Sequence, residues 1–177
     1  MFKQTFALTL ILLLASCSQH LQKTESLKKH GLLFMLHDYH QRVEYYEKKG
    51  MVEKAQAERA SIAEQNSAIV QHFKQEFDFC PVYFFYSSQY EDLAAGKPVL
   101  LNDQLRPEAS IPLPQTMIVA DYGLGNVEEN TFKLASFRID SLGIKISPTY
   151  KTRYKSETLE ARDVRKFNKK LKRMHGK

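Results

Sequence analysis

Apolar residues recur every three or four positions between Leu27 and Phe77, the spacing of a helix with one buried face. Lys48, Lys49 and Gly50 interrupt this stretch with the cations and the glycine that commonly end a helix. The pattern predicts two helices joined at Gly50 as an antiparallel hairpin, with one bent helix as the alternative. The positions that carry it are Leu33, Leu36, His40, Val43, Tyr46 or Glu47, Ala55, Ile62, Ile69, Phe73 and Phe77.

After Phe79 the pattern becomes typical of strands. Val82–Tyr86 is apolar at odd and even positions alike, which predicts a central strand covered on both faces. Ser87 and Ser88 are expected to cap a short helix over Gln89–Ala95 that ends at Gly96. Further strands are predicted over Pro98–Leu101, Gln115–Tyr122, Thr131–Asp140 and Gly143–Ile146, with a turn at Gly123, Gly125 and Asn126 and a bulge near Ala135. A final amphipathic helix after Ser156 would bury Ala161, Val164, Phe167, Leu171 and Met174.

This order of elements predicts an α+β fold. We expect an N-terminal helical hairpin or long bent helix, a small mixed or antiparallel sheet of about 4–5 strands, and a C-terminal amphipathic helix. As an alternative, Ile111-Pro112-Leu113-Pro114 before a strand, a glycine turn, a second strand and a helix resembles the second half of the thioredoxin fold, over residues 81–174. Cys80-Pro81-Val82-Tyr83 has no Cys-x-x-Cys, so that resemblance implies the fold without dithiol activity.

The N-terminus carries an export signal. Lys3 precedes an apolar run, Phe6–Leu14, which is far shorter than the ~20 residues that span a bilayer. Leu14-Ala15-Ser16-Cys17 follows and resembles the lipobox of bacterial lipoproteins. The resemblance implies that Cys17 becomes the lipidated N-terminus, with palmitate-type acyl chains that hold the protein at the membrane. Ser18, in place of aspartate after the cysteine, favours the outer membrane.

The predicted division of the chain follows from these signals. Residues 1–16 form the signal peptide, and residues 17–26 the lipidated cysteine and a polar tether. Residues 27–79 form a helical region, and residues 80–177 an α+β domain with a basic C-terminal helix. We expect 27–177 to fold as one unit, because its length suits a single core.

Charge is distributed unevenly along the chain. Residues 145–177 carry twelve Lys or Arg against three acidic residues, a net charge of +9, whereas residues 18–144 carry thirteen against seventeen, a net charge of −4. In the cell envelope the polyanions are lipid head groups and anionic polymers, so no nucleic acid partner is expected. Candidate contacts with an anionic partner are Lys169, Lys170, Lys172 and Arg173, and the alternative is a solvated face that complements the helix dipole.

Candidate chemistry is sparse. His37, His40 and Glu44 have spacing that a metal could use on neighbouring helical turns, but histidines are common on amphipathic helices and no further ligand pair is evident, so we expect no metal. Cys80 is single once Cys17 is acylated, which favours a packing role. Asp121-Tyr122-Gly123-Leu124-Gly125 precedes a strand and not a helix, which indicates a turn and not a phosphate loop.

These observations favour an envelope lipoprotein that binds or supports rather than catalyses. Its partners would be the membrane through the lipid anchor, and an envelope protein, an anionic polymer or lipid head groups. No cofactor and no catalytic residue is expected from the motifs. The alternative is a small envelope enzyme that uses Cys80 or an assembled His/Asp site.

Overall fold

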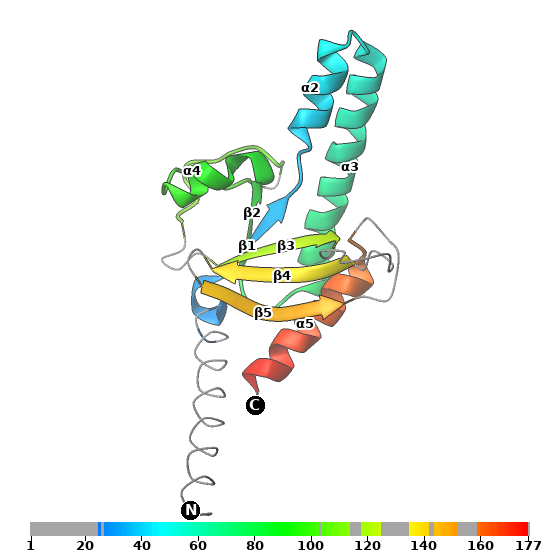
Figure 1. Cartoon of the computed structure of the whole chain (residues 1–177). Coiled ribbons are helices and arrows are strands. Elements are labelled where there is room, and N and C mark those ends of the chain that lie inside the picture. The colour runs from blue at the N-terminus through cyan, green and yellow to red at the C-terminus, as the bar shows by residue number, and fades with distance from the viewer. Residues whose placement is uncertain are drawn as a thin grey trace, which may run out of the picture.

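The computed structural model describes residues 25, 27–102, 104–113, 118–124, 135–141, 144–151 and 159–176, and Figure 1 shows their arrangement. Leu27 to His30 form a helical turn that leads into the first strand. The elements that follow are β1 (Leu32–Leu36), α2 (His40–Lys48), α3 (Val52–Glu76), β2 (Val82–Tyr86), η1 (Ser87–Gln89), α4 (Tyr90–Ala94), β3 (Ile118–Leu124), β4 (Ala135–Ser141), β5 (Ile144–Lys151) and α5 (Ala161–His175).

The strands form one sheet in the order β2-β1-β3-β4-β5. β1 runs parallel to β2 and to β3, with Phe34 opposite Phe84 and Ala120. β4 and β5 then continue the sheet in antiparallel fashion. Parallel neighbours need a crossover connection, and here α2 and α3 connect β1 to β2.

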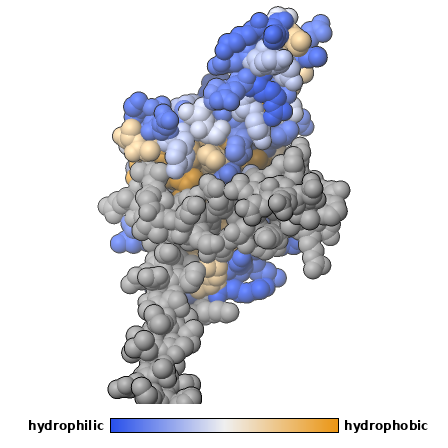
Figure 2. Space-filling model, in the orientation of Figure 1, coloured by the Kyte–Doolittle hydropathy of each residue, from blue (hydrophilic) through white to orange (hydrophobic). Residues whose placement is uncertain are grey.

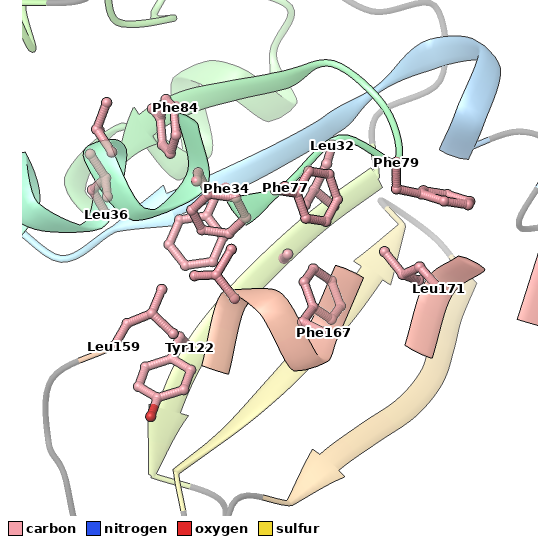
Figure 3. Packing of buried hydrophobic residues seen from close by; sticks show 14 of the residues in the cluster. Leu32, Phe34, Leu36, Phe77, Phe79, Phe84, Tyr122, Leu159, Phe167 and Leu171 are labelled. Carbon is pink, nitrogen blue, oxygen red and sulfur yellow. The ribbon is translucent and has the colours of Figure 1, made fainter. Parts of the chain in front are cut away.

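Two apolar clusters cover the two faces of the parallel part of the sheet. The main cluster joins the Phe34 face to the C-terminal half of α3 and to α5, and Figure 3 shows its aromatic rings lying between these elements. Phe73 lies 4.5 Å from Phe34 between ring centres, and Phe77 stacks on Phe167 at 5.6 Å. The second cluster covers the opposite face, where α4 and the segment after it supply Leu93, Val99 and Leu100. The central strand β1 is therefore enclosed on both sides.

The α2–α3 hairpin projects away from the sheet (Figure 1). Gly50 has a φ of +70°, and the Gly50 and Met51 amides donate to the carbonyls of Glu47 and Tyr46, which closes the turn. Val43, Ala55 and Ile62 form a small cluster of their own between the two helices. On the face that Figure 2 draws, the surface of the hairpin is mainly hydrophilic.

The predicted fold class is wrong in its central feature. Leu32–Leu36 is an interior strand of the sheet, between β2 and β3, and not the first part of a helix, so the sheet begins before the hairpin. Three of its strands, β2, β1 and β3, run parallel to one another. The sequence predicted a small mixed or antiparallel sheet made only of strands after residue 80. The run of five apolar residues is long enough to form a strand enclosed on both faces, and burial in a parallel sheet overrides the helical spacing around it.

The thioredoxin-like alternative was placed on the wrong range of the chain. Its proposed range, 81–174, omits the central strand β1. β1, α2 and α3 precede this range in the chain, and β1 with β2 supplies two of the three parallel strands.

Several local predictions are confirmed and others need correction. The chain breaks at Gly50, and α4 ends before Gly96, as expected. Phe84 and Phe85 are both buried, but β2 is an edge strand whose outer side is bridged by Leu101. Gly123 lies within β3 and not in a turn, and the irregularity in β4 falls between Phe137 and Ile139, beyond Ala135.

The last predicted strand and helix are also placed by the structure. β5 occupies the edge of the sheet as expected, although it extends to Lys151. In α5, Val164, Phe167 and Leu171 are buried, and the helix follows Glu160. The predicted turn residues Gly125 and Asn126, and Ser156 before the predicted final helix, lie outside the described ranges.

Candidate functional site

The C-terminal ends of β1 and β2 bring polar residues together with a side chain from β3. In open sheets with parallel strands, ligands bind at this edge, because successive crossovers leave a crevice there. His37 and Asp38 follow β1, Ser87 and Ser88 follow β2, and Asp121 lies within β3. We call these five residues the edge cluster.

His37 forms the first half of the edge cluster with Asp121. Its Nε2 lies 2.8 Å from Oδ1 of Asp121, and both side chains are partly buried. The hydrogen bond to Asp121 raises the pKa of His37, against the opposing effect of burial, and the charges of Asp121 and Asp38 add to the rise. Asn66 of α3 donates to the His37 carbonyl at 3.2 Å, which ties the base of the hairpin to this strand end.

Asp38 forms the second half with the two serines. Ser87 Oγ donates to one carboxylate oxygen at 2.9 Å, Ser88 Oγ donates to the other, and His40 Nδ1 lies 3.5 Å away. Burial raises the pKa of Asp38, but the hydrogen bonds from Ser88, Ser87 and His40 outweigh it, so the pKa lies below its ordinary value. The carboxylate is therefore held ionised and oriented.

Tyr39 separates the edge cluster from α2 in an uncommon backbone conformation. Its φ of +42° is left-handed, which costs a residue other than glycine about 1–2 kcal/mol. The Tyr39 ring stacks on the His37 ring at 5.6 Å, and the Arg42 guanidinium lies 4.6 Å from its centre. This turn aims the start of the hairpin away from the sheet.

Two cavities adjoin the edge cluster. One, of about 340 Å³, is lined by Asp38, Ser87, Ser88 and the first residues of α2. The other, of about 280 Å³, lies between His37, Tyr122 and the middle of α3, where Gln65 and His72 also line it. Together they offer hydroxyl, carboxylate, imidazole and amide groups to a small polar ligand.

The edge cluster does not form a nucleophilic triad. The Ser87 and Ser88 hydroxyls donate to Asp38, and Nε2 of His37 is engaged by Asp121. A triad needs the serine hydroxyl hydrogen-bonded to the imidazole that takes its proton. The arrangement is suited to polar binding.

The candidate metal ligands have separate partners. His37 pairs with Asp121, His40 with Asp38, and Glu44 with Lys48 at 3.2 Å one turn along α2. Within the described ranges, no three His, Cys, Asp or Glu residues lie close enough together to hold a metal ion. His37 therefore joins a hydrogen-bonded pair in place of the predicted helical set.

Cys80 lies just before β2, partly buried and without a disulfide partner. Burial raises the pKa of its thiol to about 12, so the reactive thiolate is scarce at neutral pH. Cys80 lines a cavity of about 480 Å³ whose walls are mostly apolar, including Phe73, Val82 and Phe84. The local chemistry supports the packing role over a catalytic one.

The four basic candidates lie in the last two turns of α5 but differ in exposure. Lys169 and Arg173 are exposed one turn apart, whereas Lys172 forms an ion pair with Asp78 at 2.6 Å. Lys170 is half-buried. One turn earlier, Arg165 binds both oxygens of Glu76 at the end of α3. Part of the basic charge therefore fastens α5 to the body, and Lys169 and Arg173 face outward.

Some site residues were not found by sequence reasoning. Ser87 and Ser88 were expected to cap a helix, but their hydroxyls bind a carboxylate 49 and 50 residues away in the chain. Asp121 was read as part of a turn. The available signal was polar residues directly after two apolar runs, which marks strand ends of a parallel sheet.

No protein-family model, no curated protein and no solved structure matches this chain. In the part of the chain that the structure describes, no helix combines the length and apolar character needed to cross a membrane. Cys17, the predicted lipidation site, lies outside that part. Interpretation of the function therefore depends on the residues of this chain alone.

Proposed function

We propose that this chain is a lipoprotein of the bacterial cell envelope that acts as a binding module and not as an enzyme. Leu14-Ala15-Ser16-Cys17 supports lipidation at Cys17, because a cysteine after small residues at the end of a short apolar run is what a lipobox requires. Two or three acyl chains would hold it permanently at the membrane, and Ser18 favours the outer membrane.

The observation that carries the binding role is the projecting hairpin. Its distal part has a small core of its own, and ion pairs fasten its two helices: Arg42 with Glu58 at 3.1 Å, and Arg59 with Glu47. Exposed apolar side chains gather at the far end in Tyr45, Met51 and Val52, the last 59 % exposed. Exposed large apolar groups at the tip of a polar arm are suited to a protein contact.

A labelling experiment tests the anchor. Radiolabelled palmitate is expected to label the wild-type chain and not Cys17→Ala, and the labelled protein should fractionate with the outer membrane. Cys80→Ala is the matched control, because it removes the other cysteine and should label normally. Labelling of Cys17→Ala would contradict the proposal.

A capture experiment tests the arm. The lipidated chain is used as bait in envelope extract, beside a Tyr45→Ala, Met51→Ala, Val52→Ala variant. Tyr90→Ala is the control, because Tyr90 is 38 % exposed on α4, outside the hairpin. Partners should be lost from the tip variant alone. Equal capture by all three proteins would contradict a role for the tip.

One observation favours a second candidate function, a small envelope enzyme. His37 and Asp121 assemble a charged pair beside two serines at the sheet edge, although they are 84 residues apart. An enzyme that uses Cys80 as its nucleophile has less support, because burial raises the pKa of this thiol to about 12 and keeps it protonated at neutral pH. Hydrolysis of a panel of ester and phosphoester substrates that disappears in His37→Ala and in Asp121→Asn would favour the enzyme.

A further inference from the structure

The start of the described chain and the end of α5 lie together at one end of the molecule. Leu27 is 3 % exposed and belongs to the main cluster, so the chain enters the body at a fixed point. Directly after it, Lys28 Nζ lies 3.4 Å from Nε2 of His175 in the last turn of α5. The His175 ring also meets Phe79 edge-on at 5.8 Å between centres.

This end of the molecule is basic. Lys28 and Lys29 are exposed, as are Lys169 and Arg173, which lie on the side of α5 opposite its buried residues. We call these four residues the basic end. Of the residues that the structure describes, the acidic groups near these elements include Glu25, which is exposed, and Asp78, which is already paired with Lys172.

The opposite end of the molecule is the hairpin. Figure 1 shows the tip of the hairpin and the end of α5 on opposite sides of the sheet. α3 has 25 residues and is about 37 Å long, and its N-terminal half forms the projecting part with α2. The hairpin and the basic end thus face in different directions.

The position of the proposed lipid fixes which end faces the membrane. Leu27 is the tenth residue after Cys17, so the lipidated residue can lie at most about 36 Å from the point where the chain enters the body. Head groups of anionic phospholipids attract lysine and arginine within about a Debye length, ~8 Å at physiological salt. A tether of this length lets the basic end reach that range, whereas the tip of the hairpin lies on the opposite side of the sheet.

We propose that the basic end is a second membrane contact, which binds anionic phospholipid head groups and orients the protein so that the hairpin points away from the bilayer. This inference rests on the proposed lipid anchor. An anionic cell-wall polymer would need no such position beside the tether, so the placement favours the lipid surface.

Lysine acetylation tests the contact in the lipidated full chain. The protein is reconstituted in vesicles of phosphatidylcholine, alone or mixed with phosphatidylglycerol, and the acetylation rate of each lysine is measured by mass spectrometry. A surface potential of about −30 mV concentrates protons and slows acetylation about threefold, before any direct contact. Lys29 and Lys169 should slow in the anionic vesicles, and Lys48 and Lys54 of the hairpin should not.

Two variants sharpen the result. In Lys29→Gln, Lys169→Gln, Arg173→Gln, the remaining Lys28 should lose its protection by phosphatidylglycerol. The control Lys48→Gln, Lys54→Gln removes two exposed hairpin cations and should keep it. High salt should remove protection from the wild type, because the Debye length contracts to ~3 Å at 1 M.

The outcomes separate this inference from the anchor. A chain that fails to float with either kind of vesicle refutes the proposed lipid anchor. A chain that floats with both, but whose Lys29 and Lys169 react equally fast in both, overturns the basic contact alone. Protection by isolated cell-wall sacculi without protection by anionic vesicles also overturns it, and assigns the basic end to a polymer.

Discussion

The two halves of α3 lie in different surroundings although they form one helix. The C-terminal half contributes Val70 and Phe73 to the main cluster, where Phe73 is 2 % exposed. The N-terminal half contributes Ala55 and Ile62, which pack only against α2 in the small cluster. Helical stability in proteins comes mostly from such packing, so the base should be stable and the tip marginal. A helix rooted in the core can thus carry an arm that has little core of its own.

Truncating one side chain in each half tests this difference and has the largest expected effect. Phe73→Ala should lower the free energy of unfolding by about 3–5 kcal/mol, because it opens a cavity among Phe34, Phe77 and Phe84. Ile62→Ala should cost about 2 kcal/mol, because its cluster is small and borders solvent. Urea unfolding followed by circular dichroism measures both. Equal losses would mean that the hairpin belongs to the same cooperative core.

Substitution of two glycines extends the test of the core and the hairpin to the backbone. Gly31 has a φ of +88°, and an added Cβ would lie 2.9 Å from the Pro81 carbonyl oxygen, at the junction of β1 and β2. Gly50 has a φ of +70° but no atom within 4 Å of such a Cβ. Gly50→Ala should therefore cost about 1–2 kcal/mol from the left-handed conformation alone, and Gly31→Ala about 3 kcal/mol. Thermal unfolding of both variants measures these losses of stability. A smaller loss for Gly31→Ala than for Gly50→Ala would contradict the tight junction of β1 and β2.

The smallest effect is expected where the hairpin joins the sheet, at His37. Its pKa is raised above the ordinary 6.5 by the hydrogen bond to Asp121, so the pair contributes stability that is fully present below that pH. The contribution is lost as the pH rises through the raised pKa. Asp121→Asn should therefore destabilise the protein more at mildly acidic than at alkaline pH, and weakly, because His37 is 34 % exposed.

Urea unfolding of the wild type and Asp121→Asn across this range measures the effect. When both proteins also carry His37→Gln, the difference in their free energies of unfolding should no longer depend on pH. A difference that grows with rising pH would contradict the assigned ion pair.

The sequence predicted the helices and strands whose pattern is local. Residues 52–76 keep one apolar stripe, and Gly50 breaks the chain where a tight turn requires a positive φ. Val82–Tyr86 was identified as a buried strand because five apolar residues fill both faces. The same rule applies to Leu32–Leu36. Because the spacing of Leu33, Leu36 and Val43 also fits a helix, the pattern predicted a helix there, and that prediction is wrong.

The edge cluster could not be predicted from spacing. It joins residues in or directly after three different strands. The hydrogen bond between Ser87 and Asp38 depends on the pairing of β1 with β2. Without β1 as a strand, no sequence rule brings His37 and Asp121 together. The basic end has the same origin, because Lys28 and His175 are 147 residues apart.

The position of the two ends of the molecule relative to the bilayer shows whether the protein is a lipid-anchored module with a projecting arm. A single cysteine is introduced at Lys29→Cys or at Glu53→Cys and labelled with a fluorescent donor, in lipidated protein on vesicles with an acceptor in the head groups. The proposed acylation occupies Cys17, and Cys80→Ala removes the other thiol, so that only the introduced cysteine takes the label. We expect strong energy transfer from position 29 and weak transfer from position 53. Equal transfer from both positions, or stronger transfer from position 53, would contradict a lipid-anchored module with a projecting arm.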